Sequence, residues 1–190
     1  AEDASWHVRE TVILCLTAFM INNWTSLSVD DRKLCSKIFS GGLLDTKPEV
    51  QELSRAGFVA YLSHKTPSEL QSFAEAYCRN SDKYLVLERR RKKDNTGDAA
   101  NDKVDPKFAN TVMMMSCLVL CFPYDMPTFM PQLVCSLVRH KRTDFLKDTI
   151  SKTVLEFKRT HQDRWEEYKE SFSRDQLDSL VNASHVSYCS

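Results

Sequence analysis

Four residues in the second half of the chain have the chemistry of a metal site. Cys117 and Cys121 are four positions apart, so both would lie on one face of a helix, and Cys135 and His140 follow them. Thiolate sulfur and imidazole nitrogen are the ligands that Zn²⁺ prefers. The run around these cysteines is apolar, however, and includes Met113–Met115. Because a helix-face cysteine usually packs as a small hydrophobic residue, we favour core packing over metal binding and expect no cofactor.

Residues with the spacing of an acid–base pair occur once more, at His161 and Asp163 beside Trp165. Their neighbours are mostly charged, which predicts an exposed helix junction rather than a catalytic cleft: Lys158, Arg159, Arg164, Glu166 and Glu167. The chain has no glycine-rich phosphate loop, no GxSxG nucleophile turn and no HExxH zinc motif. We therefore expect a binding protein and not an enzyme.

The composition predicts an all-α protein. The chain has 190 residues, 42% of them hydrophobic and 27% charged, which is enough for a buried core in one domain. Only four glycines and six prolines are present, too few for the many tight turns of a β-sandwich or barrel. Lys and Arg number 26, as do Asp and Glu, so a zero net charge argues against direct binding to nucleic acid or an anionic membrane.

The seven cysteines form an odd set scattered through apolar stretches, which is typical of reduced thiols in an intracellular protein. No run approaches the length of about 18 apolar residues that a transmembrane helix needs. The sequence starts at Ala1 without methionine or a basic leader, so we expect a piece of a longer protein.

Helical spacing of apolar residues predicts six main helices. The second one opens at Asp30-Asp31, and we expect Gly41-Gly42 near its end to adopt a left-handed conformation. The other five are expected at 6–22, 49–61, 106–120, 126–138 and 148–159.

The segment from Leu43 to Leu62 resembles a HEAT repeat. Asp45 would cap the second helix after a short turn, and Ala56 and Gly57 provide the small residues that let helices approach closely. A weaker copy begins at Trp6, and Val8 and Val50 are 42 positions apart, within the repeat period of about 40–47 residues. The sequence therefore predicts HEAT- or armadillo-like stacked antiparallel helix pairs.

One segment interrupts this pattern, residues 80–105. Lys83 together with residues 88–93 carries a net charge of +5, and an acidic stretch follows it. Such a segment cannot bury itself, so we expect a flexible charged insertion. The run Arg89, Arg90, Arg91, Lys92 and Lys93 is of the type that nuclear-import receptors bind; a solvated loop without a partner is the open alternative.

The C-terminal third carries a more specific pattern. Its segments follow in one order: Pro123-Tyr124-Asp125-Met126-Pro127-Thr128-Phe129-Met130-Pro131-Gln132-Leu133, then 149–157, Lys158-Arg159-Thr160-His161-Gln162-Asp163-Arg164-Trp165-Glu166-Glu167-Tyr168-Lys169, Phe172 and Asp175-Gln176-Leu177. This order resembles the C-terminal domain of the giant HEAT-repeat proteasome activators, and a looser, collinear resemblance extends to Trp6. It implies three regions: helix pairs with a bromodomain-like region at 1–79, the insertion at 80–105, and C-terminal helices at 106–190.

The resemblance implies docking on the alpha subunits of the proteasome core particle through the last three residues. Members of the family insert a hydrophobic-Tyr-any tail whose carboxylate pairs with a lysine. Here the tail is Tyr188, Cys189 and Ser190, with cysteine where tyrosine is expected. We therefore expect docking but do not infer gate opening; an end without a partner remains the alternative.

The resemblance also implies recognition of acetylated lysine on histones. The Asn-Phe pair of the family falls on Leu62 and Ser63, which match neither residue. Aromatic side chains could line an apolar channel, and an asparagine could donate to the acetyl oxygen. The candidate residues are Phe58, Tyr61, Leu62, Ser63, Tyr77, Asn22 and Asn23. Ordinary core packing of the aromatic residues is the alternative.

Taken together, the residues and the resemblance favour a non-enzymatic module of a nuclear and cytoplasmic proteasome activator. It would cap the core particle, recognise acetylated histones for ATP- and ubiquitin-independent degradation, and take part in DNA repair. The alternative is a purely structural end of a HEAT superhelix that only anchors the activator on the core particle.

Overall fold

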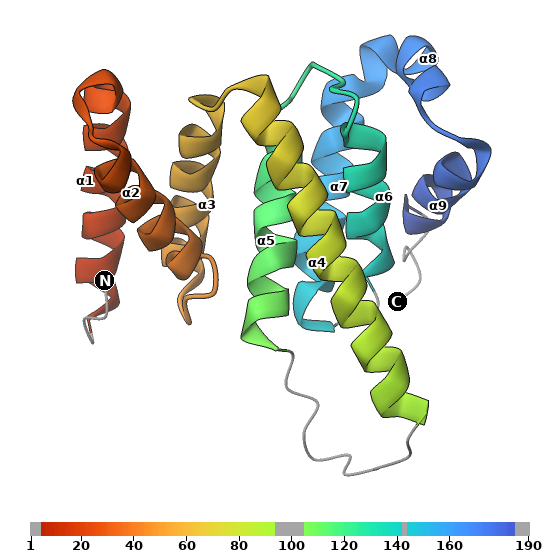
Figure 1. The fold of residues 1–190 in the computed structure, drawn as a ribbon, viewed down its shortest axis with the longest axis horizontal. Helices are drawn as coiled ribbons and strands as arrows, with labels where there is room; N and C mark the ends of the chain where they lie inside the picture. The colour runs from red at the N-terminus through yellow and green to blue at the C-terminus, as the bar shows by residue number, and fades with distance from the viewer. Residues whose placement is uncertain (1–4, 94–104, 142–143, 185–190) are drawn as a thin grey trace. The chain divides into compact units, whose positions relative to one another are not determined.

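The computed structural model describes residues 5–93, 105–141 and 144–184, and the all-α prediction is confirmed because every regular element in these ranges is helical. The chain forms two compact units, residues 1–70 and 71–190. Figure 1 labels the helices and colours the chain by residue number. Within the described residues, no helix is both long and apolar enough to cross a membrane.

Between residues 5 and 66, the first unit has three long helices and a short one. They are α1 (Trp6–Asn23), the 3-10 helix η1 (Trp24–Ser26), α2 (Val29–Gly42) and α3 (Pro48–Ser63). Helix α3 packs against both α1 and α2. The core between them is apolar and contains Ile13, Met20, Cys35, Phe39, Leu43, Val50, Phe58 and Leu62. Packing of one helix across a pair is consistent with the expected stacking of helix pairs.

Glycines in this unit serve close packing rather than a special backbone conformation. The expectation of a left-handed conformation at Gly41-Gly42 is wrong, since neither residue has a positive φ and both belong to α2. A Cβ atom on Gly42 would lie 2.0 Å from the Ser54 Oγ, and one on Gly57 would lie 2.5 Å from the Phe39 ring. These two glycines therefore let α3 approach its neighbours closely.

Asp45 does not cap α3 as the repeat pattern suggested. Lys47 occupies the N-cap position, and Pro48 begins the helix. The Asp45 carboxylate instead accepts hydrogen bonds from the Arg9 Nε at 2.7 Å and the Arg9 Nη2 at 2.8 Å. This contact with Arg9 is the main cause that lowers the pKa of Asp45. The aspartate thus ties the turn before α3 to α1.

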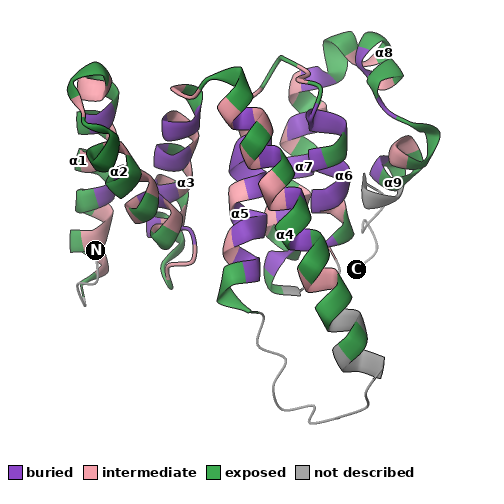
Figure 2. Ribbon diagram, in the orientation of Figure 1, coloured by how far each residue is buried: buried purple, intermediate pink, exposed green. Residues whose placement is uncertain are grey.

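The second unit contains most of α4 (Pro67–Lys93) and the C-terminal elements. These are α5 (Pro106–Leu120), α6 (Met130–Arg139), α7 (Asp144–His161), η2 (Gln162–Arg164), α8 (Trp165–Tyr168), η3 (Lys169–Ser171) and α9 (Arg174–Ser184). Helix α5 packs on α6 and α7, and α9 packs on the same two helices. Figure 2 shows buried residues gathered on α5, α6 and α7.

The expected start of the charged insertion at Asn80 differs from the structure, because α4 continues through Lys93. Ser81 is fully buried, and its Oγ lies 3.2 Å from the Oγ of Ser136 on α6. The charged residues that follow are mostly Arg and Lys, whose high helix propensity favours continuation of the helix. Residues 94–104, the remainder of the expected insertion, lie outside the described residues.

Candidate functional site

Three of the predicted acetyl-lysine residues form part of the first unit's core. Phe58, Tyr61 and Leu62 on α3 are exposed by 2%, 5% and 0%. The Phe58 and Tyr61 rings stack with centroids 5.9 Å apart. Ser63 is exposed and donates from its Oγ to the Ala60 carbonyl oxygen at 2.8 Å. The contacts of these residues are those of a packed helix.

The predicted polar donors engage their own helix. Asn22 and Asn23 donate from their side-chain nitrogens to the carbonyl oxygens of Ala18 and Phe19, at 2.8 and 2.9 Å. Tyr77 belongs to the second unit, where its ring stacks on Phe73 with centroids 6.1 Å apart. The structure thus places six of the seven candidates in the first unit, and their role in binding acetyl-lysine stays a prediction.

An aromatic and cationic cluster around Trp24 was missed in the sequence. The Arg32 guanidinium lies 4.7 Å and the Lys65 Nζ 5.9 Å from the centre of the Trp24 ring. The His64 ring lies 4.5 Å away, and Tyr61 approaches edge-on at 5.8 Å. Because these residues are far apart along the chain, only the fold brings them together. The cluster places cations of the chain itself against the indole, which fixes η1 beside α2 and α3.

Lys65 also begins an ionic network at the start of α4. Its Nζ lies 3.1 Å from the Glu69 Oε1, and the Glu69 Oε2 accepts from the Thr66 backbone N–H at 2.9 Å. That backbone hydrogen bond is the main cause that lowers the pKa of Glu69 to about 2. Burial acts to lower the pKa of Lys65, but its bonds to Glu69 and Tyr61 raise it. Both groups are therefore charged at neutral pH, and the helix start is capped.

In the second unit, two side chains hold the loop that follows α5. The Tyr168 hydroxyl donates to the Tyr124 carbonyl oxygen at 2.6 Å, and the His161 Nε2 lies 3.1 Å from the Asp125 carbonyl oxygen. The expectation that His161 sits at an exposed junction is wrong, since it is only 1% exposed. Tyr124 itself is 69% exposed. The loop therefore presents an aromatic side chain beside two backbone carbonyls, those of Tyr124 and Asp125, that are held by the C-terminal helices.

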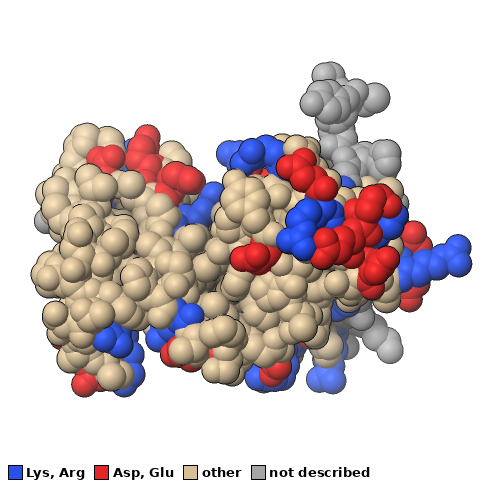
Figure 3. Space-filling view, turned by 90° about the horizontal axis from the view of Figure 1, so that it is seen from above, with Lys and Arg blue, Asp and Glu red and all other residues tan. Residues whose placement is uncertain are grey.

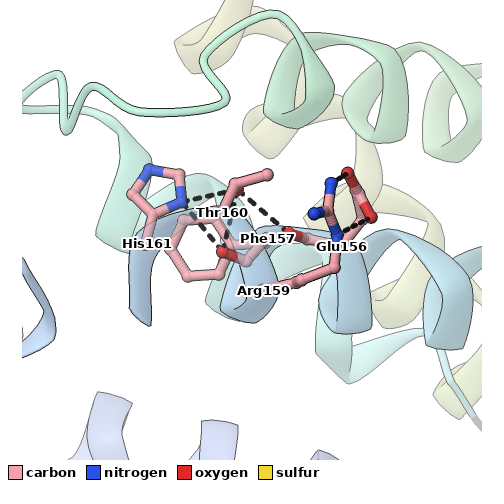
Figure 4. Close-up of polar contacts among 5 residues, drawn as sticks. All are labelled: Glu156, Phe157, Arg159, Thr160 and His161. Carbon is pink, nitrogen blue, oxygen red and sulfur yellow. Dashed lines mark hydrogen bonds and ion pairs between the residues drawn. The ribbon is translucent and has the colours of Figure 1, made fainter. Parts of the chain in front are cut away.

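Around this loop the surface carries charges of both signs. Arg159 and Glu156 form a bidentate pair with distances of 2.9 and 2.6 Å (Figure 4), and Arg164 pairs with Glu167 at 3.0 and 2.7 Å. On the face drawn in Figure 3, uncharged residues cover most of the surface, and in one region basic and acidic side chains lie beside one another.

The four residues considered for a metal site are buried or half-buried in the packed interior. Cys117, Cys135 and His140 are buried, with exposures of 0%, 4% and 1%, and Cys121 is half-buried. Within residues 5–93, 105–141 and 144–184, no group of three or more His, Cys, Asp or Glu side chains is arranged to hold a metal ion. Burial raises the pKa of Cys121 and Cys135 to about 11, so both thiols stay protonated at neutral pH.

Two of the predicted binding segments fall wholly or partly outside the described residues. The docking tail Tyr188, Cys189 and Ser190 lies beyond residue 184. The basic run Arg89–Lys93 forms the end of α4, and Arg90 is exposed there. Their binding roles stay predictions.

Comparison with known proteins identifies relatives over almost the whole chain. Residues 106–190 match the sequence model of the family described as "Proteasome activator complex subunit 4-like, C-terminal". The chain is 29% identical over 188 residues to "Proteasome activator subunit 4" of Arabidopsis thaliana, covering 98% of this chain. It is 32% identical to "Proteasome activator complex subunit 4B" of Danio rerio and to "Proteasome activator complex subunit 4" of Homo sapiens, covering 96% and 93% of this chain. The chain spans 10% of the length of each of these three relatives.

Proposed function

Because the chain belongs to the proteasome activator subunit 4 family, we propose that it is a non-enzymatic helical module that binds the proteasome core particle. The match of residues 106–190 to the C-terminal family carries this proposal. A proteasome activator acts by binding and not by chemistry, which agrees with the lack of a recognisable catalytic motif in the sequence.

An exposed apolar face supports a role within a larger helical assembly. Between Thr11 and Asn22, α1 carries no charged residue, and Val12 and Phe19, seven positions apart and so on one face of the helix, are exposed by 40% and 53%. Contiguous apolar patches on a protein surface commonly mark contact sites. This observation also favours the second candidate function, a structural end of a helix stack that only anchors the activator.

For core-particle binding, the proposed contact is the segment Tyr188–Ser190 on the alpha subunits. The test is binding of the full chain to purified core particle by surface plasmon resonance, with and without these three residues. Loss of most of the affinity on deletion is expected. A Ser187→Ala variant is the matched control, because it leaves the last three residues in place. Equal affinity of all three proteins would refute docking by the tail.

Recognition of acetylated lysine on histones is the proposed second binding activity. The partly exposed Trp24 beside Tyr61 supports it, since an indole and a phenol can contact a neutralised lysine stem. Calorimetry with acetylated and unmodified histone-tail peptides tests the proposal. Tighter binding of the acetylated peptide, weakened by Trp24→Ala and unchanged by the exposed control Lys33→Ala, is expected. If the two peptides bind equally or not at all, the acetyl-lysine proposal is refuted and the structural role remains.

The remaining proposals concern where the protein is located in the cell and what its activity requires. We propose a nuclear and cytoplasmic protein, imported through the basic run Arg89–Lys93, that acts without ATP or ubiquitin and contributes to DNA repair. Neutralising the run by substitution to glutamine should abolish nuclear accumulation of a fluorescent fusion. Unchanged accumulation would remove the import receptor from the list of partners.

A further inference from the structure

We propose that the exposed side of α1 binds the same side of α1 in a second copy of the chain, with the two helices antiparallel. Four apolar residues follow one another on this side at steps of four, three and four positions: Val8, Val12, Cys15 and Phe19. At 3.6 residues per turn, these positions fall within about 60° of one another around the helix axis. We call these four residues the outer stripe of α1.

The outer stripe lies away from the side of α1 that packs in its own unit. Ile13 and Met20 mark the packed side, with exposures of 1% and 0%. The centre of the outer stripe is about 120° from them around the helix. Its two valines and its phenylalanine are exposed by 40–53%, and Cys15 is exposed as well. A helix that is apolar on all sides is normally buried on all sides, yet one copy of the chain covers only one side of α1.

The spacing of the outer stripe fits a second helix. Alternating steps of four and three residues keep apolar side chains on a line that a neighbouring helix can follow, as in a coiled coil. From Val8 to Phe19 this line is about 17 Å long. Since no charged residue occurs between Thr11 and Asn22, no charge has to leave water when a helix covers the line. The occupant is therefore a helix with an uncharged apolar stripe of its own.

A second copy of α1 supplies such a helix. We place the two-fold axis midway between Val12 and Cys15, so that both copies use the same surface. Val12 of each copy then lies opposite Cys15 of the other, and Val8 lies opposite Phe19. Small side chains meet at the centre, and a large side chain meets a smaller one at each end. This alternation of sizes allows the side chains to interdigitate.

The charges of α1 favour the antiparallel arrangement. Arg9 and Glu10 are its only Lys, Arg, Asp or Glu residues, and both lie near its N-terminal end. In an antiparallel pair this end lies beside the uncharged C-terminal half of the other copy. In a parallel pair, by contrast, the two Arg9 side chains and the two Glu10 side chains would come near each other. The antiparallel pair therefore avoids contacts between like charges.

The predicted dimer is weak, because a single helix pair is smaller than a standard interface of about 1,200–2,000 Å². Sedimentation equilibrium of the full chain over a range of concentrations measures its affinity. We expect a monomer–dimer equilibrium with a dissociation constant of about 10 μM. A chain that remains monomeric at about 200 μM would overturn the proposal. The inference does not depend on proteasome binding.

Two charge variants separate this pairing from non-specific association. Phe19→Glu introduces a carboxylate into the outer stripe of both copies, so the affinity should fall at least about a hundredfold. Leu14→Glu is the matched control, because Leu14 is 55% exposed on the same helix but lies about 130° from the centre of the stripe. Its affinity should change by less than about threefold. Equal losses in two variants that keep the circular dichroism of the wild type would refute pairing through the stripe.

A disulfide tests the antiparallel register. In Val12→Cys the new thiol lies opposite Cys15 of the other copy, so mild oxidation should give a covalent dimer. In the wild type, the two Cys15 residues are offset by about 4.5 Å along helices whose axes are about 8–10 Å apart, which is too far for a disulfide. The bond is located by peptide mapping. A Cys15–Cys15 disulfide in the wild type, or no link between positions 12 and 15 in the variant, would contradict the proposed pairing.

Discussion

Helices α1 and α5 are both strongly apolar, yet the fold uses them differently. In α5, ten of fifteen residues are buried, whereas in α1 only Ile13 and Met20 of eighteen residues are buried. Figure 2 shows this contrast as a mostly buried α5 and a mostly exposed α1. Helix α5 has packing partners in α6 and α7, while α1 has α2 and α3. Apolar residues on a helix therefore do not tell which of its sides the fold covers.

The difference assigns separate roles to the two helices. A fully buried apolar side chain stabilises a protein by about 1.5–3 kcal/mol relative to an exposed one. Helix α5 gains this contribution at Val112, Met115 and Leu118, each at 0% exposure. Helix α1 leaves Leu14 and Phe19 more than half exposed. We therefore regard α5 as the core of the second unit and α1 as a contact surface of the first.

The largest expected effect is truncation in α5. Leu118→Ala should reduce the free energy of unfolding of the second unit by about 2–5 kcal/mol, because it removes contacts and leaves a cavity. Leu14→Ala on α1 is the matched control, with an expected change of less than about 0.5 kcal/mol. Urea denaturation followed by circular dichroism measures both. Equal losses for the two variants would contradict the contrast between the helices.

The second largest expected effect is a pH dependence of stability caused by His140, which packs on α5. This ring meets the edge of Phe108 at 4.9 Å, and both of its nitrogens are buried without a hydrogen-bond partner in the described structure. Burial is the main cause that lowers the pKa of His140 to about 4, while Asp82 raises it and Arg139 lowers it. The unfolded chain, with a histidine pKa of about 6.5, thus binds a proton that the folded chain excludes.

Stability should consequently fall as the pH decreases from about 6.5 to 4, by about 3 kcal/mol from this group. His140→Leu removes the titrating group, so it should weaken this acid dependence. The unfolding free energy at pH 6.5, 5.5 and 4.5 measures it for both proteins. An acid dependence as steep in His140→Leu as in the wild type would show that other groups are responsible.

Much of this architecture follows from local sequence signals. The bounds expected for the helix at 106–120 agree with α5, because Asp105 and Pro106 mark its start and apolar residues follow at helical spacing. The helix predicted at 6–22 differs from α1 by one residue. Both helices are short-range features, so capping and periodicity define them without knowledge of their neighbours.

The remaining features depend on contacts between segments far apart in the chain. His161 stands among charged neighbours, so its burial could not be read from the sequence; it arises because the loop at Asp125 folds over it. The role of Gly42 depends on the approach of Ser54. The sequence-based prediction assigned Tyr77 and Tyr61 to one acetyl-lysine pocket, although the two residues belong to different units.

A smaller expected difference between α1 and α5 is the reactivity of their cysteines. Cys15 on α1 is exposed, whereas Cys117 in α5 is fully buried and Cys121 at its end has a pKa raised by burial to about 11. A rise from about 9 to 11 reduces the reactive thiolate at pH 8 about a hundredfold. Iodoacetamide labelling with mass mapping should therefore modify Cys15 first. Labelling of Cys117 and Cys121 at the rate of Cys15 would contradict the burial of α5.

The smallest expected effect concerns the exposed face of α1. Phe19→Gln changes an apolar side chain that is 53% exposed, so the unfolding free energy should shift by no more than about 0.5 kcal/mol. Thr11→Gln, an exposed polar position on the same helix, is the control for helix propensity. If the apolar face of α1 is a contact surface, Phe19→Gln should instead reduce concentration-dependent self-association of the full chain, measured by sedimentation velocity, while Thr11→Gln should not. A large loss of stability in Phe19→Gln would mean that α1 is a core helix like α5, and the contrast between the two helices would disappear.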